Sequence, residues 1–351
     1  MIWVLEMSRK GVRFGVVLDF STPDEILDTA KLDEEAEFNS LWAGDHLLHF
    51  PGRTVPEAWT ILAATAVVTK RVLLGTCVSD PHRCHPAVLA QRLATIDQVS
   101  GGRVVLGLGS GVAMNLEPFG IKWNKPISRL VEAVKMMRRL WAGERFSYEG
   151  EFWKFKDAFL QIKPVKSKVP IYFAANSPRM LRLTGELADG WLPTPLSPEL
   201  YKKRLKLIED AAKNVGRAPE DIDAGLLVLT SIADKAEDAY KRLDRIKTLL
   251  VPELLKEASY EVEFPKELCS YSYFDWRATS ECLELATRYV QFVPREAAIE
   301  FSIAGTVQDC INKIDEFVKA GVKHFILLNA GPDQHKVREL YSEEIIPRFI
   351  E

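Results

Sequence analysis

Short runs of β-branched and other apolar residues alternate with longer segments of helical periodicity through the first third of the chain. This pattern predicts strands at residues 12–19, 40–43, 72–77 and 104–108, and helices at residues 23–37, 56–69, 86–99 and 127–141. Ser21 and Thr22, residue types that cap helix N-termini, precede the first predicted helix. Four strand-then-helix units in a row predict a parallel sheet, because parallel neighbours need a crossover connection between them.

The same pattern resumes in the second half of the chain after an interruption. It predicts strands at residues 171–174, at Trp191, at 225–232 and at 324–328, with helices at residues 179–187, 198–214, 235–250 and 334–349. Eight strands are more than the five or six of an open doubly wound sheet. We therefore expect residues 1–351 to form a single α/β domain, a (β/α)8 TIM barrel.

Two segments depart from this period and are expected to be insertions. Residues 143–168 contain an aromatic stretch that alternates like a β-hairpin, with Glu149 and Gly150 at its turn. Residues 251–305 are rich in aromatic and acidic side chains and lie between the seventh and eighth predicted strands. Long connections on the catalytic face of a barrel often serve as lids, so the second insertion is a candidate lid or oligomer contact.

Composition and charge narrow the function classes. The 351 residues are 47% hydrophobic and 27% charged, with a net charge of −3. This balance is typical of a globular protein with a large core and disfavours disorder and nucleic-acid binding. The only apolar run near the start covers residues 3–5, which is too short for a signal peptide or a membrane span. We expect a cytoplasmic protein with no membrane partner.

The sequence does not predict a metal site. Its five cysteines are widely spaced and contain no C-x-x-C pair. His82 and His85 stand three residues apart, but no carboxylate lies near them at helical spacing. Pro86 is suited to the first turn of a helix, which would place His82 and Arg83 at the rim of a cofactor pocket.

Candidate catalytic residues follow the second predicted strand, which ends at Asp45 and His46. The carboxyl ends of barrel strands face the active site, where His46 could carry a proton and Asp45 could orient or charge it. The alternative is a structural Asp beside a surface His. Cys77 ends the third strand among small residues that let a flat cofactor approach the backbone. A nucleophilic role for Cys77 is disfavoured, because a lone buried Cys more often serves packing.

Glycines at the end of the fourth strand give a weaker signal. Gly107, Gly109 and Gly111 resemble a dinucleotide-binding loop, but Val112 stands where its third glycine belongs. In a barrel, a glycine-rich strand end still makes room for a cofactor ring or phosphate.

The end of the fifth strand is more informative. Small residues occupy positions 174–177, and Pro178 then begins a helix. The free N–H groups at a helix start, with Ser177 and Arg179 nearby, favour an anion such as a cofactor phosphate. Simple N-capping by Asn176 or Ser177 is compatible with the same pattern.

Taken in order along the chain, these motifs resemble the luciferase-like superfamily, especially its branch that uses coenzyme F420. The matching segments are residues 42–46, 74–78, 85–103, 107–111, 188–191, 301–306 and 320–325. The resemblance implies a (β/α)8 barrel that holds the cofactor ring at the carboxyl ends of its strands. It also implies a non-prolyl cis peptide behind the ring, at Cys77–Val78 here, and a homodimer or homotetramer.

The strand ends and the resemblance together give a set of expected site residues. Asp45 and His46 are the expected catalytic residues. The expected cofactor contacts are Cys77, Val78, Gly109, Ser110, Asn115, Ala174, Ala175, Asn176 and Ser177.

Three positions depart from the patterns of the subfamilies. Similar deazaflavin-dependent dehydrogenases carry a Glu and a Trp where this chain has Val112 and Phe50, and methylene-tetrahydromethanopterin reductases carry a Glu where it has Val17. Asp19 or Glu117 could replace the missing carboxylate by geometry. The departures leave the substrate open.

The expected function is hydride transfer between coenzyme F420 and an organic substrate, in a reaction like that of the methylene-tetrahydromethanopterin reductases or of another subfamily. One alternative is an FMN-dependent luciferase-like monooxygenase. A second alternative is a non-catalytic protein that binds a flavin or deazaflavin.

Overall fold

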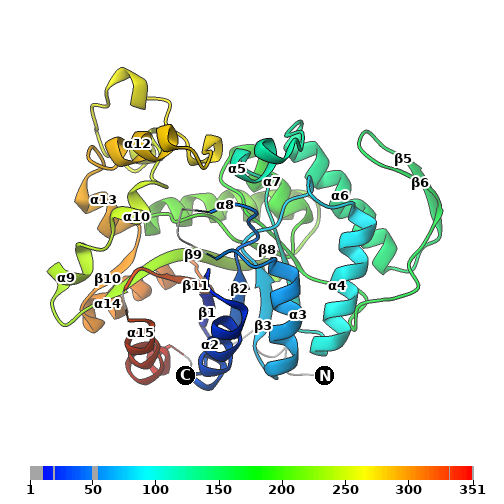
Figure 1. The fold of residues 1–351 in the computed structure, drawn as a ribbon, viewed down its shortest axis with the longest axis horizontal. Coiled ribbons are helices and arrows are strands. Elements are labelled where there is room, and N and C mark those ends of the chain that lie inside the picture. The colour runs from blue at the N-terminus through cyan, green and yellow to red at the C-terminus, as the bar shows by residue number, and fades with distance from the viewer. Residues whose placement is uncertain (1–10, 19, 50–53, 332, 350–351) are drawn as a thin grey trace.

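Eight parallel strands close into a barrel in the computed structural model, which describes residues 11–18, 20–49, 54–331 and 333–349 (Figure 1). The strands are β1 (Arg13–Val17), β2 (Ser40–Ala43), β3 (Leu73–Thr76), β4 (Val104–Leu108), β7 (Ile171–Phe173), β8 (Gly190–Trp191), β9 (Asp223–Ile232) and β11 (His324–Asn329). Each pairs in parallel with the next, and β11 pairs with β1 to close the ring. The predicted (β/α)8 barrel is confirmed.

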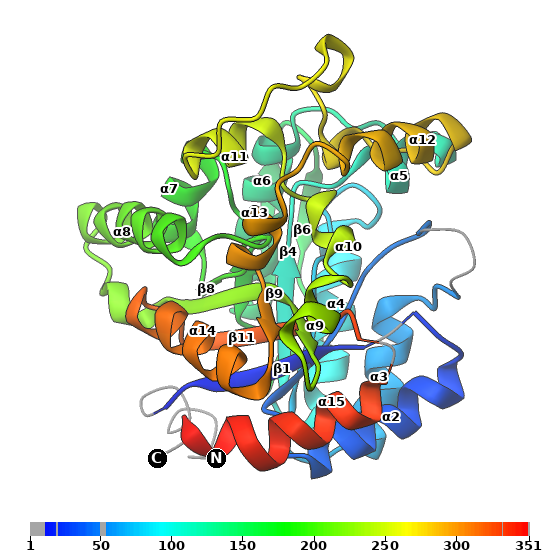
Figure 2. The same ribbon diagram turned by 90° about the vertical axis from the view of Figure 1, so that its left-hand side faces the viewer.

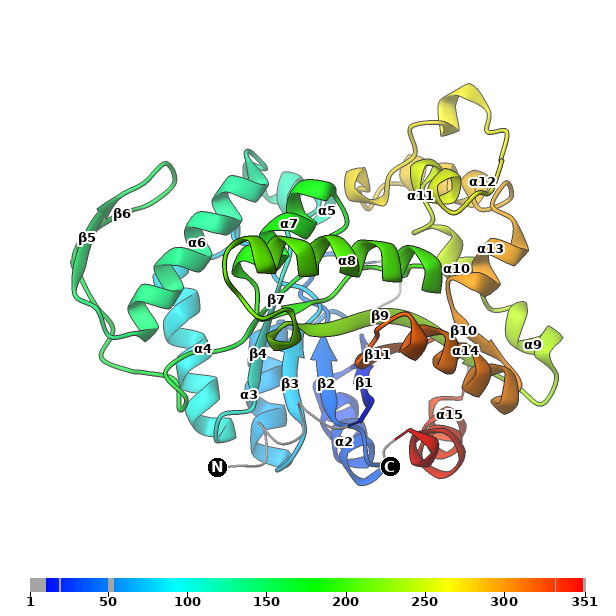
Figure 3. The same ribbon diagram turned by 180° about the vertical axis from the view of Figure 1, so that it is seen from behind.

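Helices connect these strands, and most of them cover the outside of the barrel (Figure 3). They are α2 (Pro23–Glu35), α3 (Ala58–Val68), α4 (Pro86–Ser100), α5 (Ala113–Leu116), α6 (Pro126–Trp141), α7 (Pro178–Leu187), α8 (Pro198–Asn214), α14 (Val307–Lys319) and α15 (Gln334–Leu340). The sequence pattern did not predict α14, although Thr306 and Asp309 form a capping box at its start. The predicted helix 334–349 ends as an α-helix at Leu340, and Pro347, which has no N–H, lies in a 3-10 turn beyond it.

The segment between α6 and β7 forms the predicted hairpin, β5 (Phe146–Glu149) and β6 (Lys154–Ala158). It stands away from the barrel at the outer side of α6 (Figures 1 and 3). Glu132 of α6 accepts hydrogen bonds from the backbone N–H groups of Glu151, Phe152 and Trp153. A single buried carboxylate therefore holds the turn of the hairpin against the helix.

The connection between β9 and β10 forms a helical layer above the carboxyl ends of the strands (Figure 2). It contains α9 (Ala236–Tyr240), α10 (Asp244–Lys247), α11 (Pro252–Glu257), α12 (Ser280–Tyr289) and α13 (Arg295–Glu300). The expected single helix 235–250 is two helices with a turn at residues 241–243, and Leu243 and Ile246 are both buried in the core. At its far end, β10 (Ile303–Gly305) joins the barrel sheet beside β9, so residues 303–305 are part of the sheet.

We call residues 241–290 the lid. It has an aromatic core of its own, because the ring of Tyr289 stacks between Tyr271, at 3.8 Å, and Phe264, at 5.1 Å between centroids. The Tyr271 hydroxyl donates to the carbonyl of Thr248 at 3.1 Å. Arg277 pairs with Glu117, its Nε lying 2.8 Å from Oε2, and this ion pair ties the lid to the segment after α5.

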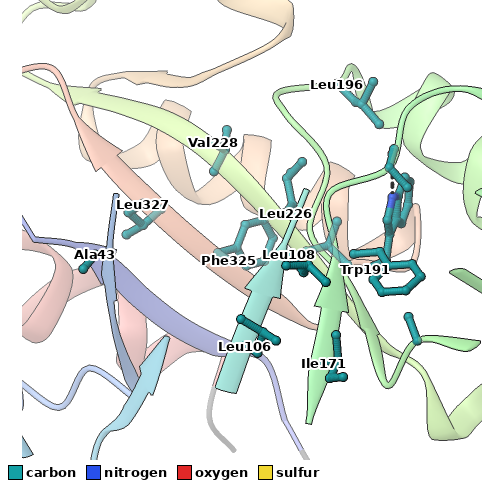
Figure 4. Packing of buried hydrophobic residues seen from close by; sticks show 14 of the residues in the cluster. Ala43, Leu106, Leu108, Ile171, Trp191, Leu196, Leu226, Val228, Phe325 and Leu327 are labelled. Atoms are coloured by element: carbon teal, nitrogen blue, oxygen red, sulfur yellow. Dashed lines mark hydrogen bonds between the residues drawn. The ribbon is translucent and has the colours of Figure 1, made fainter. Parts of the chain in front are cut away.

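Apolar side chains fill the space between the strands and the helices. Alternate strand residues such as Leu106, Leu108 and Phe325 point outward into this layer (Figure 4). A second, smaller cluster lies inside the barrel and contains Trp42, Val105, Tyr172, Leu192 and Ile326. These described residues therefore pack the centre of the barrel, and a cavity opens above this plug.

A buried polar network lies inside the barrel near the amino ends of the strands. Asp223 accepts from the Arg13 guanidinium and from the Tyr172 hydroxyl. His324 and Ser40 are joined by a hydrogen bond of 2.7 Å, and Ser40 accepts from the Trp42 indole at 2.8 Å. Burial opposes ionisation of Asp223, but Arg13 and the hydrogen bond from His324 outweigh it and hold the pKa of that carboxyl well below its usual range.

We predict that Asp223→Ala lowers the free energy of unfolding by about 3 to 5 kcal/mol, because it leaves the Arg13 charge buried without its partner. Urea unfolding at pH 7 measures this loss. Asp221→Ala, an exposed acid two residues earlier, is the matched control and is expected to change stability by less than about 0.5 kcal/mol. Because the folded-state pKa of Asp223 is depressed, its contribution is present at neutral pH and is lost as the pH falls below the usual carboxyl range. Equal stability of the two variants would contradict this account.

Candidate active site

A cavity of about 480 Å³ opens at the carboxyl ends of the barrel strands, above the apolar plug. Of the nine predicted cofactor contacts, all except Ala175 line this cavity. Ala175 is fully buried, and its carbonyl accepts the indole N–H of Trp191 at 2.8 Å. Strand ends that lie far apart in the sequence therefore meet in one place, as the barrel predicts.

Glycines at the end of β4 let the chain at the end of β3 lie close against them at the floor of the cavity. A Cβ atom on Gly107 would lie 1.8 Å from the carbonyl oxygen of Thr76, and one on Gly109 would lie 2.8 Å from Cγ2 of Val78. The peptide bond between Cys77 and Val78 is cis, as the family resemblance implied. Gly109, Ala174 and the Cys77–Val78 peptide thus leave room for a planar ring system close to the backbone.

The Cys77 thiol is suited to packing in this floor. Burial, with a smaller contribution from the Asp45 carboxylate, raises the pKa of Cys77 to about 12. The thiol therefore stays protonated at neutral pH and lacks the thiolate character of a nucleophile.

Asp45 and His46 have separate surroundings. The Asp45 carboxylate accepts from Arg83 at 2.9 Å and from the Ser79 hydroxyl at 2.5 Å. Arg83 also pairs with Asp80, Nε to Oδ2, at 2.5 Å. Asp45 lines a second cavity on the outer side of this ion cluster, whereas His46 lines both cavities. Asp45 thus holds the loop after β2 through Arg83, and the ring of His46 takes a different hydrogen-bond partner.

That partner is Asn115, whose amide fixes the protonation of the His46 ring. Its Oδ1 accepts from the backbone N–H groups of Leu47, at 2.9 Å, and Leu48, at 3.3 Å. The other end of the amide, Nδ2, is a donor and lies 3.0 Å from Nδ1 of His46. Nδ1 must therefore accept, and the proton of the neutral ring is on Nε2.

The electrostatic surroundings keep this ring uncharged. Burial, assisted by the Arg83 charge, lowers the pKa of His46 to about 4. At pH 7 the side chain is therefore a neutral imidazole with its proton on Nε2, and the ring lines the cavity. This is the behaviour of a hydrogen-bond donor that polarises a substrate oxygen, which a neutral histidine can do.

His49 is a second histidine in this wall and was not singled out in the sequence. Its ring lies 5.3 Å from that of His46 at 90°, and Phe20 packs against both, with centroids at 5.8 Å from His46 and 4.2 Å from His49. The spacing from Asp45 to His49, within one strand-end loop, was a usable signal. The lid residues of the cavity were also missed, because no periodicity relates them to the strand ends: Arg245, Thr248, Leu249, Tyr273, Phe274 and Trp276.

Asn176 and Ser177 occupy the cavity wall after β7. The Asn176 amide donates to the Thr194 hydroxyl at 2.9 Å and accepts from Arg204 at 3.1 Å. Ser177 is the N-cap of α7 and accepts from the N–H of Met180 at 3.4 Å. The predicted anion site and the predicted capping role thus fall on the same helix start, which faces the cavity.

His82 and His85 both have hydrogen-bond partners within the protein. The ring of His82 bonds the carbonyl of Lys122, and His85 caps α4 by accepting from Ala87. Within the described parts of the chain, no group of three His, Cys, Asp or Glu residues could hold a metal ion. Arg83, expected at the rim of this pocket, instead lies in the ion cluster and lines the second cavity.

Of the candidate replacements for a missing carboxylate, the described one, Glu117, does not line the cavity. Val112 lines it, as the sequence suggested, while Glu117 pairs with Arg277 of the lid. Asp19 and Phe50 lie outside the described residues. No described helix is long and apolar enough to cross a membrane.

Comparison with known proteins agrees with this geometry. Residues 7–324 match the model of the luciferase-like monooxygenase family. The chain is 34% identical to an F420-dependent glucose-6-phosphate dehydrogenase of Microbacterium testaceum, over 93% of this chain and 94% of that protein. It is 32% identical to a 5,10-methylenetetrahydromethanopterin reductase of Archaeoglobus fulgidus, over 91% and 94%.

A solved structure extends the likeness to three dimensions. An F420-dependent secondary alcohol dehydrogenase, in complex with an F420-acetone adduct, superposes with a TM-score of 0.82 at 27% identity, covering 96% of this chain and 98% of that one. Fold, strand-end motifs and sequence similarity extend over nearly the whole chain. This chain therefore belongs to the luciferase-like monooxygenase family.

Proposed function

We propose that this protein is an oxidoreductase that transfers a hydride between coenzyme F420 and an organic substrate. The observation that carries the proposal is the floor at Cys77–Val78 and Gly109, which has little side-chain bulk, beside a neutral histidine that lines the same cavity and carries its proton on Nε2. The relatives named above include F420-dependent enzymes with different substrates, which supports the cofactor more strongly than the substrate.

The residues present fit a deazaflavin. Gly109 and Ala174 line the cavity with little or no side chain, and a Cβ at Gly109 would lie 2.8 Å from Cγ2 of Val78, which lines the same cavity. Asn176, Ser177 and the start of α7 would hold the phosphate of the cofactor. When bound, the deazaflavin supplies hydride chemistry at its C5 carbon. FMN is the second candidate, and oxygen consumption with reduced FMN would favour it.

The chain's own residues then have defined tasks. Asn115 donates a hydrogen bond to Nδ1 of His46 and so keeps the ring proton on Nε2. From there the proton is available to a substrate oxygen. Arg83 holds the loop after β2 by pairing with Asp45 and Asp80, and its charge also disfavours protonation of His46. The lid covers the cavity and limits the access of water, which strengthens the hydrogen bond from His46. Asp45 is a positioning residue in this arrangement.

We also propose that the protein is cytoplasmic and forms a homodimer or homotetramer. Helix α3 has no charged residue, although its outer face is open: Val67 is 63% exposed. Val88 of the neighbouring α4 is 49% exposed. A helix that is apolar on all sides is normally covered, and a second copy of the chain would cover it here. Light scattering that shows only monomers at micromolar concentrations would contradict this proposal.

The first test of the proposed function is cofactor binding. We predict that oxidised coenzyme F420 binds with a micromolar or lower Kd, measured from the change in its fluorescence. Ala174→Leu fills the ring space and is expected to weaken binding at least tenfold. Ala142→Leu, an exposed alanine after α6, is the matched control and is expected to bind like the parent. Absence of binding to the parent protein would overturn the proposal.

The second test addresses the protonation of His46. In ¹⁵N-histidine NMR, we predict a ring with protonated Nε2 and unprotonated Nδ1 from pH 6 to 8, because the folded-state pKa is about 4. In Asn115→Asp, a carboxylate replaces the donor and stabilises Nδ1–H, so the pKa of His46 is expected to rise into that range.

Two further variants make this test specific. His46→Gln assigns the resonances, and Asn214→Asp, an exposed amide at the end of α8, is the control that leaves His46 unchanged. A His46 ring that already titrates near pH 6.5 in the parent protein would contradict the neutral-donor role.

A further inference from the structure

One buried arginine joins the wall of the cavity to the lid. Arg204 of α8 has a side chain that is only 10% exposed. Its Nη1 donates to Oδ1 of Asn176 at 3.1 Å, and its Nη2 donates to Oε2 of Glu257 at 2.7 Å. Asn176 lines the cavity, whereas Glu257 is the last residue of α11 in the lid. A single planar guanidinium therefore contacts both parts of the molecule.

The Asn176 amide depends on this contact for its orientation. A guanidinium has only donors, so the end of the amide that faces Arg204 is the accepting Oδ1. The other end, Nδ2, donates at 2.9 Å to the hydroxyl of Thr194, which also lines the cavity. The Thr194 side chain in turn hydrogen-bonds Tyr273 of the lid. The Asn176–Thr194 pair is thus connected to the lid at both ends.

Charge makes the contact between Arg204 and Asn176 sensitive to the position of the lid. Glu257 supplies the carboxylate of the salt bridge to Arg204. A buried charge that loses its partner is strongly destabilised. Displacement of α11 therefore favours a turn of the Arg204 side chain toward water, and Oδ1 of Asn176 then loses its donor.

The neighbouring Lys203 contacts the same carboxylate from the solvent side. Its Nζ lies 3.3 Å from Oε1 of Glu257, and its side chain is 64% exposed. An exposed ion pair of this kind contributes little to stability, because water screens it. Among the described hydrogen bonds, Lys203 makes none to Asn176. Two adjacent cations therefore share one partner, but only Arg204 connects that partner to the cavity.

We propose that Arg204 is a positioning residue that couples closure of the lid to retention of the cofactor. With Glu257 in place, Arg204 holds the Asn176 amide in the wall where the cofactor phosphate binds. Without Glu257, that wall loosens and the cofactor dissociates faster. By linkage, the bound cofactor stabilises the position of α11 to the same extent. This inference rests on the proposed function, in which Asn176 and Ser177 hold the phosphate of coenzyme F420.

The test measures the dissociation rate of oxidised coenzyme F420 by stopped-flow fluorescence. Arg204→Met keeps an apolar stem of similar length but removes the donors and the charge. We expect it to raise the dissociation rate about tenfold, because a hydrogen bond from a charged group to the wall is lost. Lys203→Met is the matched control, since it removes the same charge from the same partner. Its rate is expected to stay within about twofold of the parent.

Glu257→Ala tests the dependence on the lid without changing Arg204. It is expected to raise the dissociation rate about three- to tenfold. In the Arg204→Met background it should have no further effect, because both changes break the same connection. The Glu257 side chain is 32% exposed, so this variant is expected to fold and to keep the test decisive if Arg204→Met does not. Effects that multiply in the double variant would overturn the inference.

Hydrogen exchange supplies a readout that a merely structural role of Arg204 would not change. Saturation with F420 is expected to slow the exchange of the backbone amides of α11 in the parent protein and in Lys203→Met. In Arg204→Met this protection should be largely lost, even where the variant and the parent have the same unfolding midpoint.

The outcomes separate the two proposals. If F420 binds and dissociates equally fast from Arg204→Met and Lys203→Met, the inference on Arg204 is wrong and the proposed function stands. The same holds if F420 protects α11 equally in both variants. Failure of the parent protein to bind F420 overturns the proposed function and the inference with it.

Discussion

The Asn115 side chain connects the parts of the site that must be fixed relative to one another. It lies on α5, accepts from two backbone N–H groups in the loop after β2, and donates to the ring of His46. Because an amide has one accepting and one donating end, the two backbone contacts decide the orientation of the amide. The orientation in turn decides which nitrogen of His46 carries the proton. A contact that appears structural therefore determines the chemistry that the cavity can perform.

In the barrel, the buried stabilising network and the candidate functional residues lie at opposite ends of the strands. At the amino ends of the strands, the network around Asp223 is buried and its charges are paired. Above it, the Trp42 plug closes the interior. Only the carboxyl ends are left open, and there the ion cluster of Arg83 fixes the loop after β2. The polar groups buried near the amino ends of the strands are thus paired with one another, which offsets the cost of burying them. The groups that would contact a ligand lie at the carboxyl ends.

The fold could be predicted from the sequence because local patterns carry it. The strands at 40–43 and 104–108 and the helix at 198–214 match the structure at both ends. Predictions failed where tertiary packing overrides periodicity, as in the turn at 241–243, and where a strand as short as β10 joins a sheet far away in sequence.

The candidate site was only partly predictable for a related reason. Residues at strand ends, such as Cys77 and Gly109, are placed by topology, so the barrel alone brings them together. The orientation of Asp45 toward Arg83 depends on side-chain contacts 38 residues apart. The lid residues depend on how a 50-residue connection folds over the barrel. Neither kind of contact leaves a periodic signal in the sequence.

A crystal structure of the protein with oxidised coenzyme F420 tests the central claim most directly. The account predicts one face of the deazaflavin ring on Cys77–Val78 and Gly109, the other face open toward Phe274 and Trp276, and Nε2 of His46 directed to the space above the ring. A ring bound elsewhere, or a His46 ring turned from Asn115 toward Asp45, would contradict it.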